Sequence, residues 1–302
     1  MESQLQLIDM PEDSMRHILE RCDFVSIQCL RKTCHTFRNF IDETKPLQLI
    51  NDINISGASQ EFSLTLFANN DFVFYPAGGK IQLNYNCLWN GNIKRSWHQM
   101  DGDRWKIIAN ENILDALSRD LRTALECRLS KWNEISMSYE CPNLVMEIIK
   151  SICPGTLVRL CLAAAGEHWN MSELVKLEQW NNAKELDMRR VIASADIESY
   201  SHFETAKICF ENVTMDDLCK LKKIFLNTSS ITKRFELHGA HILSEETMIT
   251  ALGQPYLSRE PVSKYWYFKR SDNYVLCVNS SVADFIFSII TKDDVPREAI
   301  VI

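Results

Sequence analysis

Cysteine and histidine are the residues of this chain whose chemistry is most easily recognised from spacing. The sequence holds 11 cysteines and 7 histidines, but no Cys-x-x-Cys pair occurs. The densest cluster, Cys22, Cys29, Cys34 and His35, fits none of the usual zinc patterns. His238 and His241 form a His-x-x-His pair that follows a strand pattern and lacks the His-Glu of metalloprotease helices. We therefore expect reduced thiols, mostly buried, and no metal or other cofactor.

Catalytic motifs are equally scarce. The strained Gly-x-Ser-x-Gly turn of serine hydrolases does not occur, and Gly79-Lys80 lacks the earlier glycine and the following hydroxyl of a phosphate-binding loop. Asp216 and Asp217 follow Thr214 at a predicted helix start, where capping and the helix dipole explain them. We therefore predict that the chain is not an enzyme, and an enzyme on an α/β scaffold is the least favoured alternative.

Charge and hydropathy exclude two further classes of partner. The formal net charge is -7, from 33 Lys and Arg against 40 Asp and Glu, which argues against a generally basic nucleic-acid-binding protein. The first residues show no signal-peptide pattern, and the most apolar stretches, 156–166 and 282–290, are far shorter than the roughly 20 residues that span a bilayer. We expect an intracellular protein, cytoplasmic or nuclear, that binds neither nucleic acid nor membrane.

The N-terminal segment has the periodicity of short amphipathic helices. Pro11 suits a first helical turn, and Glu12 and Asp13 favour the positive end of a helix. One apolar stripe then follows helical spacing at Met15, Ile18, Leu19 and Cys22, and further stripes contain Phe24, Ile27, Leu30, Cys34, Phe37 and Ile41. Some three helices in about forty residues bury little core, so we expect this segment to pack against a partner or the rest of the chain.

These residues resemble an F-box in the form common in the large nematode families. The matching positions are Met10, Pro11, Ile18, Leu19, Ser26, Leu30, Arg31, Cys34 and Arg38, while Thr33 stands where an apolar residue is more usual. The resemblance implies docking onto the Skp-type adaptor of a cullin–RING (SCF) ubiquitin ligase and, through it, onto the cullin. The residues expected to contact the adaptor are Met10, Pro11, Met15, Ile18, Leu19 and Leu30. A generic helical lobe is the alternative.

Residues 47–109 alternate polar and apolar side chains, as in Phe62, Leu64 and Leu66, which predicts half-buried strands. Turn signals stand at 69–71, 76–79 and 90–92, so we expect an antiparallel hairpin layer. Trp89, Trp97 and Trp105 recur within it, and we expect them to pack in the core, with a peptide-binding aromatic surface as the alternative.

Residues 110–302 predict a helix over 110–128 and then a recurring strand–helix unit. The predicted strands are 135–139, 156–163, 184–190, 205–211 and 233–239, and the helices between them are 144–152, 172–182, 195–203 and 215–227. Their inward-facing pairs begin at Ile135, Leu160, Leu186, Ile208 and Phe235, so the unit repeats every 22 to 27 residues. That period is typical of leucine-rich-repeat-like solenoids, although the Asn/Cys ladder of standard repeats is missing.

This half resembles the FTH domain. The residues that carry the resemblance are Leu177, Glu178, Gln179, Trp180, Ala183, Lys184 and Leu186, then His202, Phe203, Thr214, Asp216, Asp217, Leu218, Leu221 and Lys222, and the Pro154-Gly155-Thr156-Leu157 step. A closing hairpin is expected at 265–278. Together with the F-box, the whole chain is similar to nematode F-box A proteins. Trp180 lies in a helical stripe, so we expect it to be buried.

The outward-facing residues of the repeat strands form the candidate target-binding surface. Alternation along each strand points them away from the helices. The candidates are Glu134, Ser136, Arg159, Asp187, Arg189, Lys207, Glu236 and His238. Their mixed charges suit a protein or peptide, whereas the alternative is a merely solvated or covered face.

The sequence therefore predicts an F-box at 1–46, a β-hairpin layer at 47–109, and an FTH domain with strand–helix repeats and a C-terminal hairpin at 110–302. The fold class is α+β or α/β, with an irregular solenoid. The predicted function is substrate recognition for an SCF ubiquitin ligase, with an unknown target protein. The alternative is a free-standing interaction module whose F-box no longer couples to ubiquitination.

Overall fold

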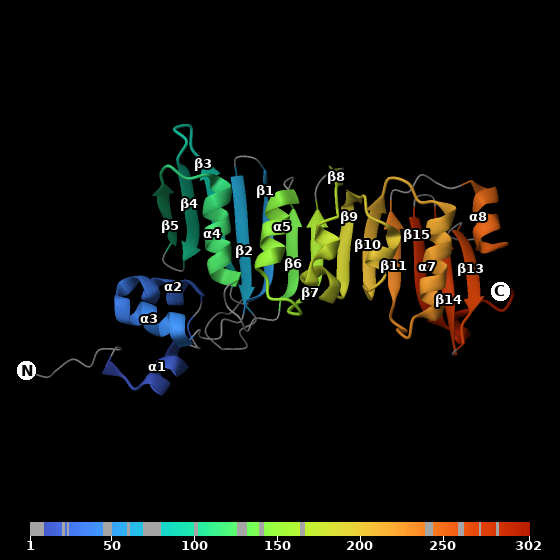
Figure 1. Ribbon diagram of the computed structural model, residues 1–302, viewed down its shortest axis with the longest axis horizontal. Helices are drawn as coiled ribbons and strands as arrows, with labels where there is room; N and C mark the ends of the chain where they lie inside the picture. Colours follow the sequence, from blue (N-terminus) through green and yellow to red (C-terminus); the bar gives the residue numbers. More distant parts are fainter. Residues whose placement is uncertain are drawn as a thin grey trace, which may run out of the picture. The chain divides into compact units, whose positions relative to one another are not determined.

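The computed structural model describes residues 9–19, 22, 24–44, 50–58, 61–68, 80–99, 102–125, 132–138, 142–163, 167–238, 244–258, 263–271, 273–281 and 284–302. The chain divides into two compact units, residues 1–137 with 143–157 and residues 138–142 with 158–302. Both units combine helices and strands, so the fold is mixed α/β, as predicted (Figure 1). The division into an F-box, a hairpin layer and an FTH domain stays a prediction.

The first unit begins with the three predicted helices, α1 (Glu12–Leu19), α2 (Phe24–Thr33) and α3 (His35–Thr44). Their apolar stripes meet in a small core of their own, formed by Met15, Leu19, Ile27, Phe37 and Ile41. Arg31 on α2 donates from Nε and Nη2 to the two carboxylate oxygens of Asp42 on α3, at 2.7 and 3.2 Å. This forked ion pair ties the second helix to the third beside the apolar core.

An antiparallel meander follows, as the alternation predicted. Its strands are β1 (Ile50–Ala58), β2 (Glu61–Ala68), β3 (Lys80–Cys87), β4 (Ile93–Gln99) and β5 (Gly102–Ile108). The turn at 90–92 is confirmed: Gly91 has a φ of 77° and donates its N–H to the carbonyl of Leu88 at 2.9 Å. The predicted turns at 69–71 and 76–79 lie outside the described residues.

Helix α4 (Ile113–Leu125) follows the meander, then strand β6 (Trp132–Ser138), which lies next to β1, and helix α5 (Pro142–Ser151). Asp120 on α4 accepts a hydrogen bond from the buried Tyr85 hydroxyl at 2.8 Å and also pairs with Arg95. Burial, together with the charge of Asp120, raises the pKa of Tyr85 far above its ordinary value. The expectation of core packing is wrong for Trp89 and Trp105, which are exposed.

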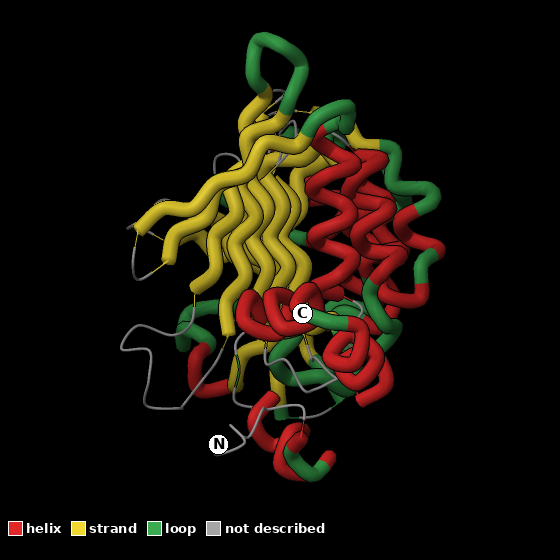
Figure 2. The backbone as a smooth tube through the Cα atoms, turned by 90° about the vertical axis from the view of Figure 1, so that its left-hand side faces the viewer, coloured by secondary structure: helices red, strands yellow, loops and turns green. Residues whose placement is uncertain are grey.

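The second unit contains the parallel strands that the repeat predicted. They are β7 (Leu157–Ala163), β9 (Glu185–Ala193), β10 (Thr205–Phe210) and β11 (Arg234–His238), paired in that order, with the short β8 (Glu167–Trp169) also beside β9. The crossovers hold η2 (Leu174–Lys176), α6 (Glu178–Asn182), η3 (Ile197–Tyr200) and α7 (Met215–Asn227). Figure 2 shows the longer helices gathered on one side of the strands.

Antiparallel strands complete this unit. They are β12 (Tyr256–Ser258), β13 (Ser263–Lys269), β14 (Tyr274–Ser280) and β15 (Asp284–Thr291), and β15 pairs with β11. The hairpin of β13 and β14 confirms the predicted closing hairpin. Helix α8 (Glu245–Leu252) precedes β12, and η4 (Lys292–Asp294) follows β15. The C-terminal Val301 bridges to Tyr267 and so covers the free part of the β13 edge.

The core of the second unit lies between the strands and the crossover helices. The expected inward pairs from Leu160 to Leu237 are all buried, as are Trp180, Phe203, Leu221 and Phe225 on the opposing elements. The indole N–H of Trp180 donates to the carbonyl of Ser199 at 3.3 Å, and its ring meets Phe203 edge-on at 5.0 Å. The predicted burial of Trp180 is therefore confirmed.

Candidate protein-binding surfaces

The strands of the second unit carry a ladder of charged side chains on the face opposite the core. We call this set the polar ladder: it consists of Arg159, Glu185, Asp187, Arg189, Lys207, Arg234, Glu236, His238 and Asp284. All but Asp284 follow from strand alternation, because their neighbours along each strand are the buried inward pairs. Glu134 and Ser136 are half-buried on β6 in the first unit.

Cross-strand register brings opposite charges together within the polar ladder. Arg159 on β7 stands opposite Glu185 on β9, with Nε 3.8 Å from Oε2. Lys207 on β10 stands opposite Glu236 on β11, with Nζ 3.6 Å from Oε2. Opposite charges at facing positions stabilise a pair of strands by a fraction of a kcal/mol, roughly 0.2–1. Register therefore holds the charges of the polar ladder in place.

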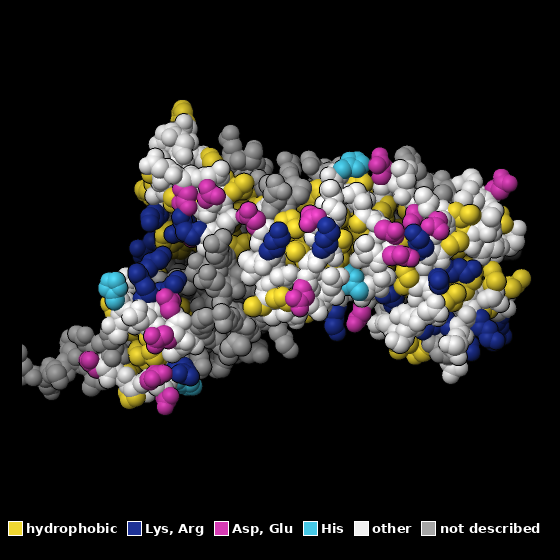
Figure 3. Space-filling view, in the orientation of Figure 1, with side chains coloured by type: hydrophobic (Ala, Val, Ile, Leu, Met, Phe, Trp, Pro, Cys, Tyr) yellow, Lys and Arg dark blue, Asp and Glu magenta, His cyan; other side chains and the backbone are white. Residues whose placement is uncertain are grey.

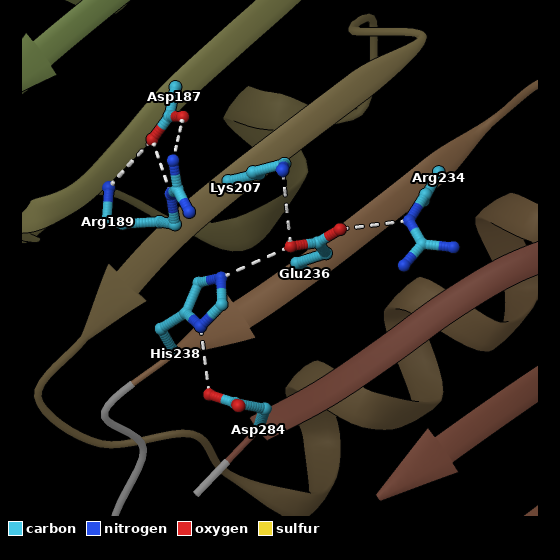
Figure 4. A network of polar contacts seen from close by, with 7 residues as sticks. All are labelled: Asp187, Arg189, Lys207, Arg234, Glu236, His238 and Asp284. Atoms are coloured by element: carbon cyan, nitrogen blue, oxygen red, sulfur yellow. Dashed lines mark hydrogen bonds and ion pairs between the residues drawn. The ribbon is translucent and has the colours of Figure 1, made fainter.

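Glu236 is the centre of this arrangement (Figure 4). It accepts a hydrogen bond from Nε of Arg234 at 2.9 Å, and Nε2 of His238 lies 3.5 Å from its other oxygen. The side chain of Glu236 is 13% exposed. Burial raises the pKa of Glu236, but the hydrogen bond from Arg234 and the charges of Lys207 and Arg234 outweigh it, so the pKa lies below its ordinary value. Glu236 is therefore ionised at neutral pH.

Asp187 on β9 forms a second centre. Arg189, two residues along the same strand, donates to it from Nε at 3.0 Å and from Nη2 at 2.8 Å. Burial raises the pKa of Asp187. The hydrogen bonds from Arg189 and the charge of Lys207 lower it by more, so the pKa lies below its ordinary value. Arg189 itself is about half exposed, with a side-chain exposure of 51%. Its guanidinium is held in place by Asp187 and remains accessible to a partner.

His238 links the parallel strands to the antiparallel hairpin. Its Nδ1 lies 2.9 Å from Oδ1 of Asp284, which stands opposite it on β15. Sequence reasoning missed Asp284 because no strand was assigned to 284–291. The available signal was the alternation of Phe285 and Phe287 with smaller residues.

Cys209 on β10 stands opposite His238 of the polar ladder. Burial raises the pKa of the Cys209 thiol, which disfavours the nucleophilic thiolate. Among the residues that the structure describes, no group of three or more His, Cys, Asp or Glu could hold a metal ion. The geometry suits recognition of another charged surface, because fixed charges of both signs favour one partner and disfavour wrong ones.

A separate hollow of about 260 Å³ lies at the carboxyl ends of β8, β9 and β10. It is lined in part by Phe210, Asp196, Glu211 and Asp217. Asp217 accepts hydrogen bonds from the N–H and hydroxyl of Thr214, at 2.9 and 2.7 Å, and so caps α7. A hydrogen bond from the Glu198 N–H and the charge of Lys220 hold the pKa of Asp196 below its ordinary value. These helix-capping roles account for both aspartates, and the hollow gives no support to the enzyme alternative.

The residues expected to contact an adaptor divide into two groups. Met15 and Leu19 are buried in the core of the three helices, at 7% and 0% exposure. Met10, Ile18 and Leu30 are half-buried, and Pro11 is exposed. Pro11 immediately precedes α1, and its carbonyl accepts the N–H of Met15 at 3.0 Å.

Two buried cations of the second unit escaped sequence reasoning, which treats lysine and arginine as surface residues. Lys233 donates from Nζ to the carbonyls of Ser201 and Phe203, at 2.6 and 2.7 Å, and burial lowers its pKa. Arg270 donates to the carbonyls of Phe225 and Thr228 at the end of α7, both at 2.7 Å. Both cations satisfy main-chain carbonyls that core packing leaves without a partner.

Comparison with known families finds two matching domain models. The model of the F-box domain matches residues 7–49, and the model of the FTH domain matches residues 112–249. No match was found among the curated proteins or the solved structures. Among the described residues, no helix has both the length and the apolar character needed to cross a membrane.

The chain therefore carries an F-box domain followed by an FTH domain. This order is typical of nematode F-box A proteins, and both resemblances seen in the sequence are confirmed. This architecture is typical of non-catalytic adaptor proteins, and an F-box domain implies binding to a Skp-type adaptor. The resemblance to the FTH domain rested partly on Trp180, Phe203 and Thr214, which the structure places in the core and at a helix cap.

Proposed function

We propose that this protein is the substrate-recognition subunit of an SCF-type ubiquitin ligase. The observation that supports it best is the presence of an F-box domain and an FTH domain in one chain. The three N-terminal helices would bind the Skp-type adaptor and, through it, the cullin. The FTH domain would bind the target protein through the polar ladder, with Glu134 and Ser136 as further candidates.

The proposed mechanism is proximity. A target held on the FTH domain while the F-box holds the adaptor meets the ubiquitin-loading enzyme at high effective concentration, so its lysines react without catalysis by this chain. No cofactor, nucleic acid or membrane is part of this proposal, and the site of action is intracellular. The parallel block from β7 to β11, with helices between its strands, supports interpretation as an irregular leucine-rich-repeat-like solenoid.

The adaptor contact divides between the two groups of predicted residues. We propose that Met10, Pro11 and Ile18 touch the adaptor, because they retain exposed surface. Met15 and Leu19 support the interface from within, since they form the core that positions α1. Leu30 packs against that core and retains some surface, so it can do both.

The experiment is co-purification of the full chain with a Skp-type adaptor, comparing the parent with Pro11→Ala/Ile18→Asp. Truncating an anchor and introducing a charge should weaken adaptor binding at least tenfold, because apolar anchors dominate such interfaces. The matched control is His17→Asp, which adds an acid at an exposed neighbouring position of α1. If the parent captures no adaptor, the chain is a free-standing interaction module. If the double variant captures as much as the parent, the proposed contact is wrong.

A further inference from the structure

Strand β5 of the first unit is exposed on both of its faces. Its residues Arg104, Trp105, Lys106 and Ile107 are all exposed, whereas inward residues of β1 to β3, such as Ile55, Phe62 and Tyr85, are buried. Among the described strands, β5 has one neighbour, β4, so its second edge is open. An open edge presents main-chain donors and acceptors that can pair with another strand.

In the second unit, the edge of strand β13 shows how this protein covers an edge. Strand β12 has only 3 residues, and the rest of the β13 edge is bridged by the C-terminal Val301. Strand β5 has 7 residues, and within the described parts of the chain no other strand pairs with its second edge. A strand of this length with an open edge and an exposed tryptophan is a pairing site unless something covers it.

The two faces of β5 differ in chemistry. Arg95 contacts Asp120 on α4, and Lys106 stands opposite Arg95, so Arg104 and Lys106 share the helix-side face. Trp105 and Ile107 alternate with them onto the other face, where Nζ of Lys94 lies 5.9 Å from the Trp105 ring centre. Trp105 is 63% exposed. Basic and apolar side chains therefore alternate along β5 between its two faces.

Charge on this part of the molecule is opposite to that of the whole chain. Strands β4 and β5 contain Lys94, Arg95, Arg104 and Lys106 against the single acid Asp103, although the net charge of the chain is -7. Figure 3 shows lysine and arginine side chains gathering over β4 and β5. A strand that pairs with β5 would therefore be favoured by acidic residues on one face and apolar residues on the other.

We propose that the open edge of β5 binds an extended segment of a partner protein that alternates acidic and apolar residues. The segment would add a strand to the meander, set its acids beside Arg104 and Lys106, and set its apolar residues beside Trp105 and Ile107. This surface includes no residue of the polar ladder or of the F-box helices, and it does not depend on the ubiquitin-ligase function proposed above. A second copy of β5 would place like charges opposite each other, which disfavours self-pairing.

The test uses the full chain and a labelled peptide of alternating valine and glutamate, equal in length to β5. We expect saturable binding by fluorescence anisotropy, and slower amide hydrogen exchange confined to residues 102–108. A peptide with the same residues in two blocks, and one with lysine in place of glutamate, should bind at least tenfold more weakly.

Two variants locate the contact. Lys106→Glu should weaken binding of the valine–glutamate peptide about tenfold and strengthen binding of the valine–lysine peptide, because it reverses one facing charge. Lys223→Glu makes the same charge change on α7 and should leave both affinities unchanged. Adaptor capture should be the same in both variants.

The proposal is overturned if the block peptide binds as well as the alternating one, or if exchange slows outside β5. Equal or tighter binding of a uridine oligonucleotide would also overturn it, in favour of a nucleic-acid surface. Concentration-dependent dimerisation that protects β5 would replace the acidic partner by a second copy of this chain.

Discussion

Single residues of the polar ladder are held by several partners, and Glu236 shows what this implies. Its carboxylate faces Lys207, Arg234 and His238 while being 13% exposed. Removing its charge weakens the hydrogen bond from Arg234 and the ion pair with Lys207 on a partly dehydrated face. Glu236 therefore stabilises the face on which we propose target binding, as well as being a candidate contact.

A pH titration of stability tests this role. The folded pKa of Glu236 lies below its ordinary value, so the stability it contributes is present above the unfolded pKa, roughly 4, and is lost as pH falls through the folded pKa. Glu236→Gln should lower the free energy of unfolding by about 1–2 kcal/mol at pH 7. The difference from the parent should shrink below about pH 4.

Chemical denaturation at several pH values measures the difference in free energy of unfolding between Glu236→Gln and the parent. Glu298→Gln removes a charge from an exposed position and serves as the control. A difference between Glu236→Gln and the parent that stayed constant down to pH 2 would show that the ion pairs do not contribute.

Trp180 gives a second prediction for a single residue. It is fully buried against Tyr200 and Phe203, and its indole N–H donates a hydrogen bond to the carbonyl of Ser199. Trp180→Ala should lower the free energy of unfolding by about 3–5 kcal/mol, since it leaves a large cavity. Trp105→Ala, at a 63% exposed position, should change it by less than about 0.5 kcal/mol. Thermal unfolding compares them, and a stable, cooperatively folding Trp180→Ala variant would contradict the structural role.

Side chains hold both ends of helix α7. Thr214 and Asp217 form a capping box at the start of α7, and Arg270 reaches its end from the residue after β13. The guanidinium meets the negative end of the helix dipole while satisfying two carbonyls. Arg270 therefore couples α7 to the closing hairpin.

Arg270→Met should remove this coupling while filling part of the same space. We expect a loss of about 2–3 kcal/mol in the free energy of unfolding, because two hydrogen bonds from a charged donor are lost, one buried and one partly buried. Hydrogen exchange should also accelerate in the last turn of α7. Lys269→Met, at the exposed neighbouring position, is the control and should leave that turn unchanged. Equal exchange in the two variants would show that Arg270 does not hold the helix end.

At the scale of the whole molecule, the proposed function requires two surfaces that can be disabled separately. The F-box helices have their own core, and the polar ladder belongs to the other compact unit. Changing one surface should therefore leave the fold of the other intact.

Charge reversal at Arg159 and Arg189 tests this separation. Arg159→Glu/Arg189→Glu should weaken target capture about tenfold, because the fixed charges set which partner fits. Adaptor capture should be unchanged. The control is Lys223→Glu/Arg297→Glu, which makes the same charge change away from the polar ladder. Quantitative affinity purification with mass spectrometry reads adaptor and target together, and an unaltered set of captured targets would place target binding elsewhere.

Much of the fold could be predicted because local periodicity was unambiguous. Helix α7 was expected at 215–227 and spans those residues, and strands β7, β9, β10 and β11 lie within a few residues of their predicted positions. The reason is physical: burial of one face imposes period two on a strand and period 3.6 on a helix, and both periods are written in the order of residues. Alternation along the strands likewise assigned the residues of the polar ladder, apart from Asp284, to the face away from the core.

Tertiary structure alone decided which side chains meet. Asp284 comes to His238 only through the pairing of β15 with β11, across 46 residues of chain. Met15 and Leu19 are buried because α2 and α3 fold back over them, which a stripe on α1 does not reveal. Trp89 and Trp105 are exposed because a turn tip and an edge strand have no opposing layer. The sequence by itself determined the elements, their inward faces and both domain resemblances, since these depend on local order. Long-range pairing, edges and burial depend on which elements become neighbours, so the fold alone decided them.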